Sequence, residues 1–197
     1  MRKKSHISLC KGILHGLDLT GRVHHKLSFY IGSIWPDCIP SFITKRHNID
    51  ETFDIFTNRM NKFIAKFNKE KDMSAIQTMR MGMVLHYIAD YFTFPHNSHY
   101  QGTIKDHCIY EEGLKKKMYE FVAEEKKKLA KASSLDLPVF TSVKQITEFI
   151  KEKHSQYMKL DGNVDSDCLY AFKSCMVVMS SLLLIADRSQ VLAGVNV

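Results

Sequence analysis

The chain contains few residues that interrupt helices, with only 4 prolines and 9 glycines among its 197 residues. No stretch rich in proline, glycine or serine divides it, which argues against a flexible linker between two domains. With 45% apolar residues, it is long enough to bury one substantial core. We therefore expect one domain over residues 1–197. Long stretches of 3.6-residue periodicity predict that this domain is an all-α, multi-helix bundle.

The sequence also lacks a long hydrophobic run and a recognisable export signal. Its longest apolar run, 175–186, is well short of the roughly 20 residues that span a bilayer. The first residues are basic, but the segment that follows is amphipathic, unlike a signal peptide. Five cysteines, an odd number without a recognisable spacing, indicate reduced thiols. We expect a cytoplasmic protein without a transmembrane segment, for which peripheral contact with a membrane stays open.

The periodicity predicts six or seven helices. They are expected at about 5–19, 23–33, 51–69, 72 or 74 to 92, 104–131, 142–160 and 165–188. Ser5 and Asp50 are the expected N-caps of the first and third helices, and Pro95 cannot continue the fourth. The last helix is apolar on almost every side, so we expect it at the centre of the bundle.

Two histidine–carboxylate pairs recur at i,i+4 spacing: His86 with Asp90, and His107 with Glu111, with His96 between them. Residues four apart share a helix face, so each pair can direct an imidazole nitrogen and a carboxylate oxygen at one metal ion. Such a pair alone is common on surface helices. Here both pairs continue an apolar stripe, and a buried carboxylate is costly unless it is paired or coordinates a metal. Five ligands exceed what one zinc needs, so the pattern indicates a polynuclear site.

Four positions outside this segment could complete the site. They are Met1, His6, Asp37 and His47. Without the central cluster, each of them would more simply be interpreted as an ordinary terminal, turn or loop residue than as a metal ligand. Cys38 and Cys108 adjoin candidate ligands, but we expect them to be small core residues.

The order and spacing of these residues resemble the zinc-dependent phospholipase C family, whose fold is shared with zinc-dependent single-strand-specific nucleases. The series runs His86-x3-Asp90-x5-His96-x10-His107-x3-Glu111 and is preceded by a histidine, an aspartate and a second histidine. The resemblance covers the first 111 residues. The segments 29–40 and 90–96 resemble short, single-domain bacterial members.

The resemblance implies a trinuclear zinc site between the helices. The first ion would be held by Asp37, His47, His86 and Asp90. The second would be held by the bridging Asp90, by His6 and by the amino terminus of Met1. The third would be held by His96, His107 and Glu111. Asp37 would be the catalytic residue that orients or deprotonates the attacking water.

The amino terminus departs from the family pattern. Secreted members begin, after cleavage, with a tryptophan whose amino and carbonyl groups ligate zinc. Here Met1 would take that place, five residues before His6.

The expected activity is zinc-dependent hydrolysis of a phosphodiester, by phospholipase C-type cleavage of a phospholipid. The net charge of +7 also suits nucleic acid, so a nuclease or other phosphodiesterase with the same metals stays an alternative, as does a non-catalytic metal-binding scaffold. Stacked aromatics around the metals would favour bases, and a shallow apolar rim would favour diacylglycerol. The nearby aromatics, most of them expected in the core, are Tyr87, Tyr91, Phe92, Phe94 and Tyr100.

Overall fold

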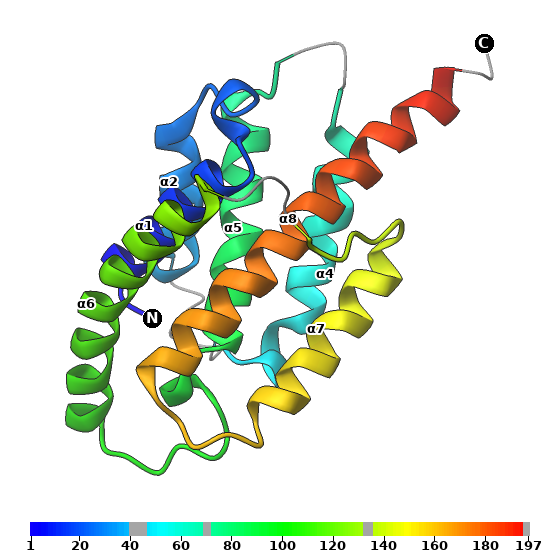
Figure 1. Cartoon of the computed structure of the whole chain (residues 1–197). Coiled ribbons are helices and arrows are strands. Elements are labelled where there is room, and N and C mark those ends of the chain that lie inside the picture. Colours follow the sequence, from blue (N-terminus) through cyan, green and yellow to red (C-terminus); the bar gives the residue numbers. More distant parts are fainter. Residues whose placement is uncertain (40–46, 69–71, 132–135, 195–197) are drawn as a thin grey trace.

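The computed structural model describes residues 1–39, 47–68, 72–131 and 136–194, and side chains as far as residue 189. Within these ranges every regular element is helical, which confirms the expected all-α bundle (Figure 1). The α-helices are α1 (Lys3–Gly16), α2 (Lys26–Ile34), α4 (Ile49–Lys66), α5 (Ala75–Tyr91), α6 (Ile104–Leu129), α7 (Val143–Tyr157) and α8 (Val164–Gly194). Short 3-10 turns lie at Leu19–Gly21, Trp35–Cys38 and Phe94–His96.

Helix α5 lies inside the bundle and packs against α1, α2, α4 and α8. A capping box starts it: the Ser74 side chain accepts from the Gln77 backbone, and the Gln77 side chain accepts from the Ser74 backbone. Every residue from Met81 to Tyr91 is buried. The candidate ligands of this helix therefore lie in the interior, as their apolar stripe predicts.

Two glycines let α2 and α5 approach backbone to backbone. A Cβ atom on Gly32 would collide with the carbonyl oxygen of Met79, and one on Gly82 would collide with the carbonyl oxygen of Phe29. Only glycine fits at such a crossing. The contact fixes the end of α2, and with it the turn Trp35–Cys38, beside α5.

Helix α8 crosses the bundle diagonally in Figure 1 and packs against α1, α4, α5, α6 and α7. This confirms its expected central position. By length and composition its segment Val164–Ser189 could cross a membrane, with a mean hydropathy of 1.9, but 67% of its most apolar window is buried inside the bundle. That burial is typical of the core helix of a globular protein.

Both predicted N-caps are wrong. Helix α1 already begins at Lys3 after Arg2, and Ser5 is buried within it. In α4 the Asn48 side chain, and not Asp50, accepts the cap hydrogen bond, from the Glu51 backbone nitrogen at 2.9 Å. Asn48 stands one residue before the first helical position, where a side chain can reach the free N–H groups.

Candidate metal centre

One cluster of four candidate ligands forms where α5 meets the turn after α2 and the start of α4. The Nδ1 atom of His47 lies 3.2 Å from Asp37 Oδ1 and 3.3 Å from Asp90 Oδ2. The Nε2 atom of His86 lies 3.6 Å from Asp37 Oδ1 and 3.2 Å from Asp90 Oδ2. Zinc binds nitrogen and oxygen at about 2.0–2.2 Å, so two ligands of one tetrahedral ion lie about 3.3 Å apart. The four side chains thus have the spacing that one zinc requires.

A backbone carbonyl orients the His86 ring toward this cluster. Its Nδ1 atom lies 2.9 Å from the Ser33 carbonyl oxygen, which can only accept a hydrogen bond. Nδ1 therefore carries the proton, and in the neutral ring the lone pair of Nε2 faces Asp37 and Asp90. Such an outer hydrogen bond is the usual partner of a metal-binding histidine.

A second cluster forms between the turn Phe94–His96 and the first turns of α6. The Glu111 Oε1 atom lies 3.3 Å from His96 Nε2 and 3.2 Å from His107 Nε2. These distances also match two ligands of one tetrahedral zinc. The His107 side chain is 34% exposed, and the side chains of His96 and Glu111 are 15% exposed, so this cluster is open to solvent on one side.

Asp90 and the amino terminus connect the two clusters. The Met1 amino nitrogen is buried and lies 2.6 Å from Asp90 Oδ1, 3.1 Å from Glu111 Oε1 and 3.1 Å from His96 Nε2. His6 Nε2 lies 3.3 Å from the same Asp90 oxygen. Asp90 therefore presents Oδ1 to the terminus and His6, and Oδ2 to the first cluster, which is the arrangement of a bridging carboxylate.

Two buried polar atoms in this centre make no hydrogen bond. They are Asp90 Oδ2 and His6 Nε2, on side chains that are 0% and 1% exposed. Nitrogen and oxygen atoms lie near both of them, but none in hydrogen-bonding geometry. Buried polar groups are costly without partners, and a bound cation would satisfy both. The donor set and its orphaned atoms therefore fit zinc.

The charges of the centre also favour a cation. Burial alone would raise the pKa of Asp90, but the amino terminus and the surrounding histidines hold it well below its usual range. Burial lowers the pKa of His6 to about 4, so its ring is neutral near pH 7 and free to ligate. Burial also lowers the pKa of His47, but the nearby carboxylates of Asp37 and Asp90 outweigh burial and raise it to about 9. At His47 a metal ion would displace a proton.

A hydrogen-bond network behind the second cluster has no signature in the sequence. Asp167, in the first turn of α8, accepts from the Phe94 backbone nitrogen at 3.0 Å and from the Tyr110 hydroxyl at 3.0 Å. It also accepts from the Tyr157 hydroxyl at 2.6 Å. Phe94 begins the turn that carries His96, and Tyr110 directly precedes a candidate ligand on α6. One buried carboxylate thus ties together the segments that supply the second cluster.

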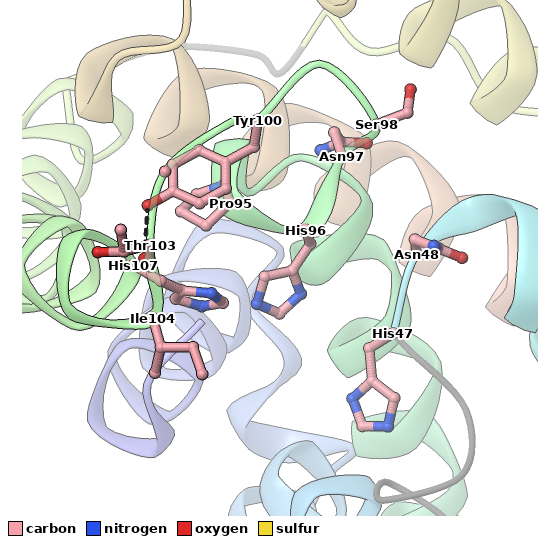
Figure 2. Close-up of a pocket in the computed structure, with 11 residues that line it drawn as sticks. His47, Asn48, Pro95, His96, Asn97, Ser98, Tyr100, Thr103, Ile104 and His107 are labelled. Atoms are coloured by element: carbon pink, nitrogen blue, oxygen red, sulfur yellow. Dashed lines mark hydrogen bonds between the residues drawn. The ribbon is translucent and has the colours of Figure 1, made fainter.

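Two cavities open onto the centre, and both are lined by His96 and His107. The first has a volume of about 550 Å³ and is shown in Figure 2, where His96 lies between His107 and His47. It is lined by His47, Asn48, Pro95, His96, Asn97, Ser98, Tyr100, Gly102, Thr103, Ile104 and His107. The second has a volume of about 650 Å³ and is lined by Met1, Arg2, Lys3, Lys4, Asp37, His96, His107, Cys108, Glu111 and Lys115.

The structure brings the whole predicted ligand set together. One feature was not expected from the sequence: the amino terminus contacts Glu111 and His96 as well as Asp90. The prediction for the cysteines is wrong. Cys38 and Cys108 are exposed rather than buried in the core, and Cys108 lines the second cavity.

Comparison with known proteins identifies the family. A model described as zinc-dependent phospholipase C matches residues 5–164. No curated protein and no solved structure matches the chain. The matched region contains all eight candidate side-chain ligands, from His6 on α1 to Glu111 on α6. Because the match covers more than half of the chain, the protein belongs to the zinc-dependent phospholipase C family.

Proposed function

We propose that the protein is a zinc-dependent phosphodiester hydrolase that cleaves phospholipids in the manner of a phospholipase C. The observation that carries this proposal is the pair of ligand clusters joined by Asp90, in a chain of this family. In our assignment, the ligands are Asp37, His47, His86 and Asp90 for one zinc, and His96, His107 and Glu111 for another. A further zinc on His6, Asp90 and the Met1 amino group would make the centre trinuclear.

Bound zinc would supply Lewis acidity, which lowers the pKa of a bound water toward neutrality. The protein's own part falls to Asp37. Its side chain is 23% exposed and lines the second cavity, unlike the fully buried Asp90. Hydrogen bonding to His47 is the main influence that lowers its pKa against the effect of burial. Asp37 therefore stays ionised and can accept a hydrogen bond that orients a water toward phosphorus.

The surroundings of the centre favour a lipid over a nucleic acid. Ile104, on the wall of the first cavity, is 86% exposed. Such an exposed apolar side chain beside the centre suits the acyl chains of a diacylglycerol. Tyr100 is the only phenyl or phenol ring among the described residues of that wall, and it packs edge-on against Phe94 with 5.2 Å between ring centroids. One ring does not provide the series of aromatic faces on which successive bases stack.

The remaining nearby aromatics support the same preference. Tyr87, Tyr91 and Phe92 are buried in the core, with exposed fractions of 4%, 0% and 0%. Buried rings cannot stack on a substrate. These three residues therefore do not provide the stacked aromatic rings that a nuclease site would be expected to have.

Parallel assays of the zinc-loaded protein on phosphatidylcholine and phosphatidylserine, single-stranded DNA and a chromogenic phosphodiester test the proposal. We expect hydrolysis of lipid and of the chromogenic ester, with diacylglycerol as the lipid product. Zinc-stripped protein and the Asp37→Asn variant serve as controls and should be inactive or nearly so. Faster hydrolysis of DNA than of lipid would favour the nuclease. No hydrolysis of any substrate would favour the metal-binding scaffold.

A further inference from the structure

The second cavity differs from the first in its charge. Four cationic side chains line it: Arg2, Lys3, Lys4 and Lys115. The described wall of the first cavity contains no lysine or arginine. Both cavities reach the metal centre through His96 and His107, so a substrate held there has one side without lysine or arginine and one side lined by four such residues.

Most of this positive charge is not neutralised locally. Arg2 pairs with Glu112, with 2.7 Å between Nη1 and Oε2, and Lys115 pairs with the same carboxylate. One glutamate thus faces two cations. Lys3 and Lys4 are exposed and have no ion pair among the described residues. When the candidate zinc ligands are left out of the count, the four cationic side chains and Glu112 give this cavity a net charge of about +3.

The position of Lys3 and Lys4 is unfavourable for the helix that carries them. Both lie in the first turn of α1, which contains no acidic residue. The N-terminal end of a helix carries partial positive charge, so cations there cost stability. Their placement beside a metal centre is more readily explained by a ligand than by the fold.

The wall of this cavity also does not suit a choline headgroup. Quaternary ammonium groups are recognised by aromatic faces, and the described wall contains no phenylalanine, tyrosine or tryptophan. Lysines around the cavity would repel the choline charge. An anionic group would instead be attracted by two or more ammonium groups at short range.

We propose that the basic cavity binds the headgroup of the substrate and selects a headgroup that carries its own anionic group, a carboxylate or a phosphate, over choline. This inference rests on the proposed phospholipase activity. The scissile phosphodiester lies at the metal centre, the headgroup lies toward Lys3 and Lys4, and the diacylglycerol lies toward Ile104 and the first cavity.

Binding of an analogue that cannot be hydrolysed tests headgroup selection independently of catalytic activity. The probes are short-chain phosphatidylserine and phosphatidylcholine analogues in which carbon replaces the glycerol-side ester oxygen, so that the bond cannot be hydrolysed. Both are used as monomers below their micelle concentration, which removes attraction to a membrane surface. We expect the zinc-loaded protein to bind the serine analogue about tenfold more tightly than the choline analogue, as titration calorimetry would measure.

Two double variants with the same net charge test whether the preference for the serine analogue depends on Lys3 and Lys4. Lys3→Ser with Lys4→Ser should lose most of the preference for the serine analogue. Lys127→Ser with Lys131→Ser removes two exposed lysines in the last turn of α6 and just after it, and should retain the preference. The first variant removes cations from a helix N-terminus, so its melting temperature should not fall. Values of kcat/KM for the hydrolysable lipids should follow the same order.

Several results would overturn the proposal. They are equal binding of the two analogues, equal loss of preference in both double variants, and tighter binding of a single-stranded oligonucleotide than of the serine analogue through Lys3 and Lys4. Selective binding of the serine analogue without hydrolysis of any phosphodiester would support the headgroup site and refute the proposed enzyme activity.

Discussion

Asp90 contacts candidate ligands on both sides of the metal centre. It is fully buried, and its two oxygens face different partners, the amino terminus and His6 on one side and His47 and His86 on the other. Glu111, by comparison, has one oxygen, Oε1, in contact with His96, His107 and the Met1 amino group. The two carboxylates should therefore differ in how many metal ions they hold.

The Asp90→Asn variant should be more damaging than Glu111→Gln. In the proposed centre Asp90 bridges two zincs, so neutralising it would remove a charged ligand from both, and zinc content should fall by at least one ion more than in Glu111→Gln. The loss of hydrolysis should exceed the roughly 10–100-fold cost of altering an outer-sphere partner of a metal ligand. Elemental analysis and phosphodiester assays of both variants check this. Full zinc and full rate in Asp90→Asn would mean that Asp90 does not bridge.

Residues appended before Met1 should remove one zinc. The Met1 amino group is buried among Asp90, Glu111 and His96. Burial lowers its pKa, but the two carboxylates outweigh burial and raise it. A peptide bond at this nitrogen abolishes both its charge and its lone pair. Protein with an N-terminal tag should therefore hold less zinc and lose most activity, whereas a C-terminal tag should change neither. Equal zinc and equal rates in the two proteins would show that the amino group is not a ligand.

At the scale of elements, the contact between α2 and α5 positions the first cluster. It places the Ser33 carbonyl on the His86 ring and the turn Trp35–Cys38 beside α5. The Gly82→Ala substitution forces a Cβ against the Phe29 carbonyl oxygen, so the helices must separate. We expect a loss of about 1–3 kcal/mol in the free energy of unfolding, together with weaker zinc binding.

Gly113→Ala is the matched control, because a Cβ there meets no atom within 4 Å. Gly113 lies within α6, so alanine should stabilise the protein by about 0.5–1 kcal/mol. Denaturant unfolding and zinc titration of both variants measure the difference. A Gly82→Ala protein with unchanged stability and zinc affinity would show that the close approach of α2 and α5 does not support the site.

Asp167 connects α8 to the elements of the second cluster, and it should give stability a pH dependence. Burial raises the pKa of Asp167 to about 6 against the effect of its hydrogen bonds. The folded state therefore binds this proton more tightly than the unfolded chain, in which the pKa is near 3.9. Its stabilising contribution is complete below about pH 4 and is lost as the pH rises through about 6.

The Asp167→Asn variant should lose this contribution, which is at most about 3 kcal/mol. The amide has one acceptor oxygen where the carboxylate has two, so at least one of the hydrogen bonds from Phe94, Tyr110 and Tyr157 should also be lost, at a cost of about 1–3 kcal/mol at pH 7. The gap in unfolding free energy between wild type and variant should widen from pH 7 to pH 4, measured with a chelator so that zinc release does not contribute. A gap that is constant with pH would contradict the raised pKa.

At the scale of the whole molecule, the sequence predicts the centre well where ligands share a helix. His86 with Asp90, and His107 with Glu111, follow from the 3.6-residue period because spacing along a helix fixes direction in space. The sequence offers Asp37, His47 and His6 only as candidates, and the family resemblance assigns them to the site, since their approach depends on how α1, α2 and α4 pack around α5. The contact of the amino terminus with Glu111 and the network of Asp167 arise from tertiary packing alone. No local pattern encodes them.

The bundle and the metal centre should depend on each other. The candidate ligands come from the amino terminus, α1, the turn after α2, the segment before α4, α5, the turn after it and α6. Metal binding at such a junction adds its free energy to folding. The centre therefore accounts for why an all-α chain keeps several ionisable groups in its interior.

Zinc content tests the central claim most directly. The purified protein, with Met1 as its first residue, is equilibrated with zinc, desalted and measured by elemental analysis. Two separate ligand clusters predict at least two tightly held zincs per chain, and the amino terminus with His6 predicts a third that is lost more readily. A content below one zinc per chain would contradict the polynuclear centre and the catalytic function proposed from it.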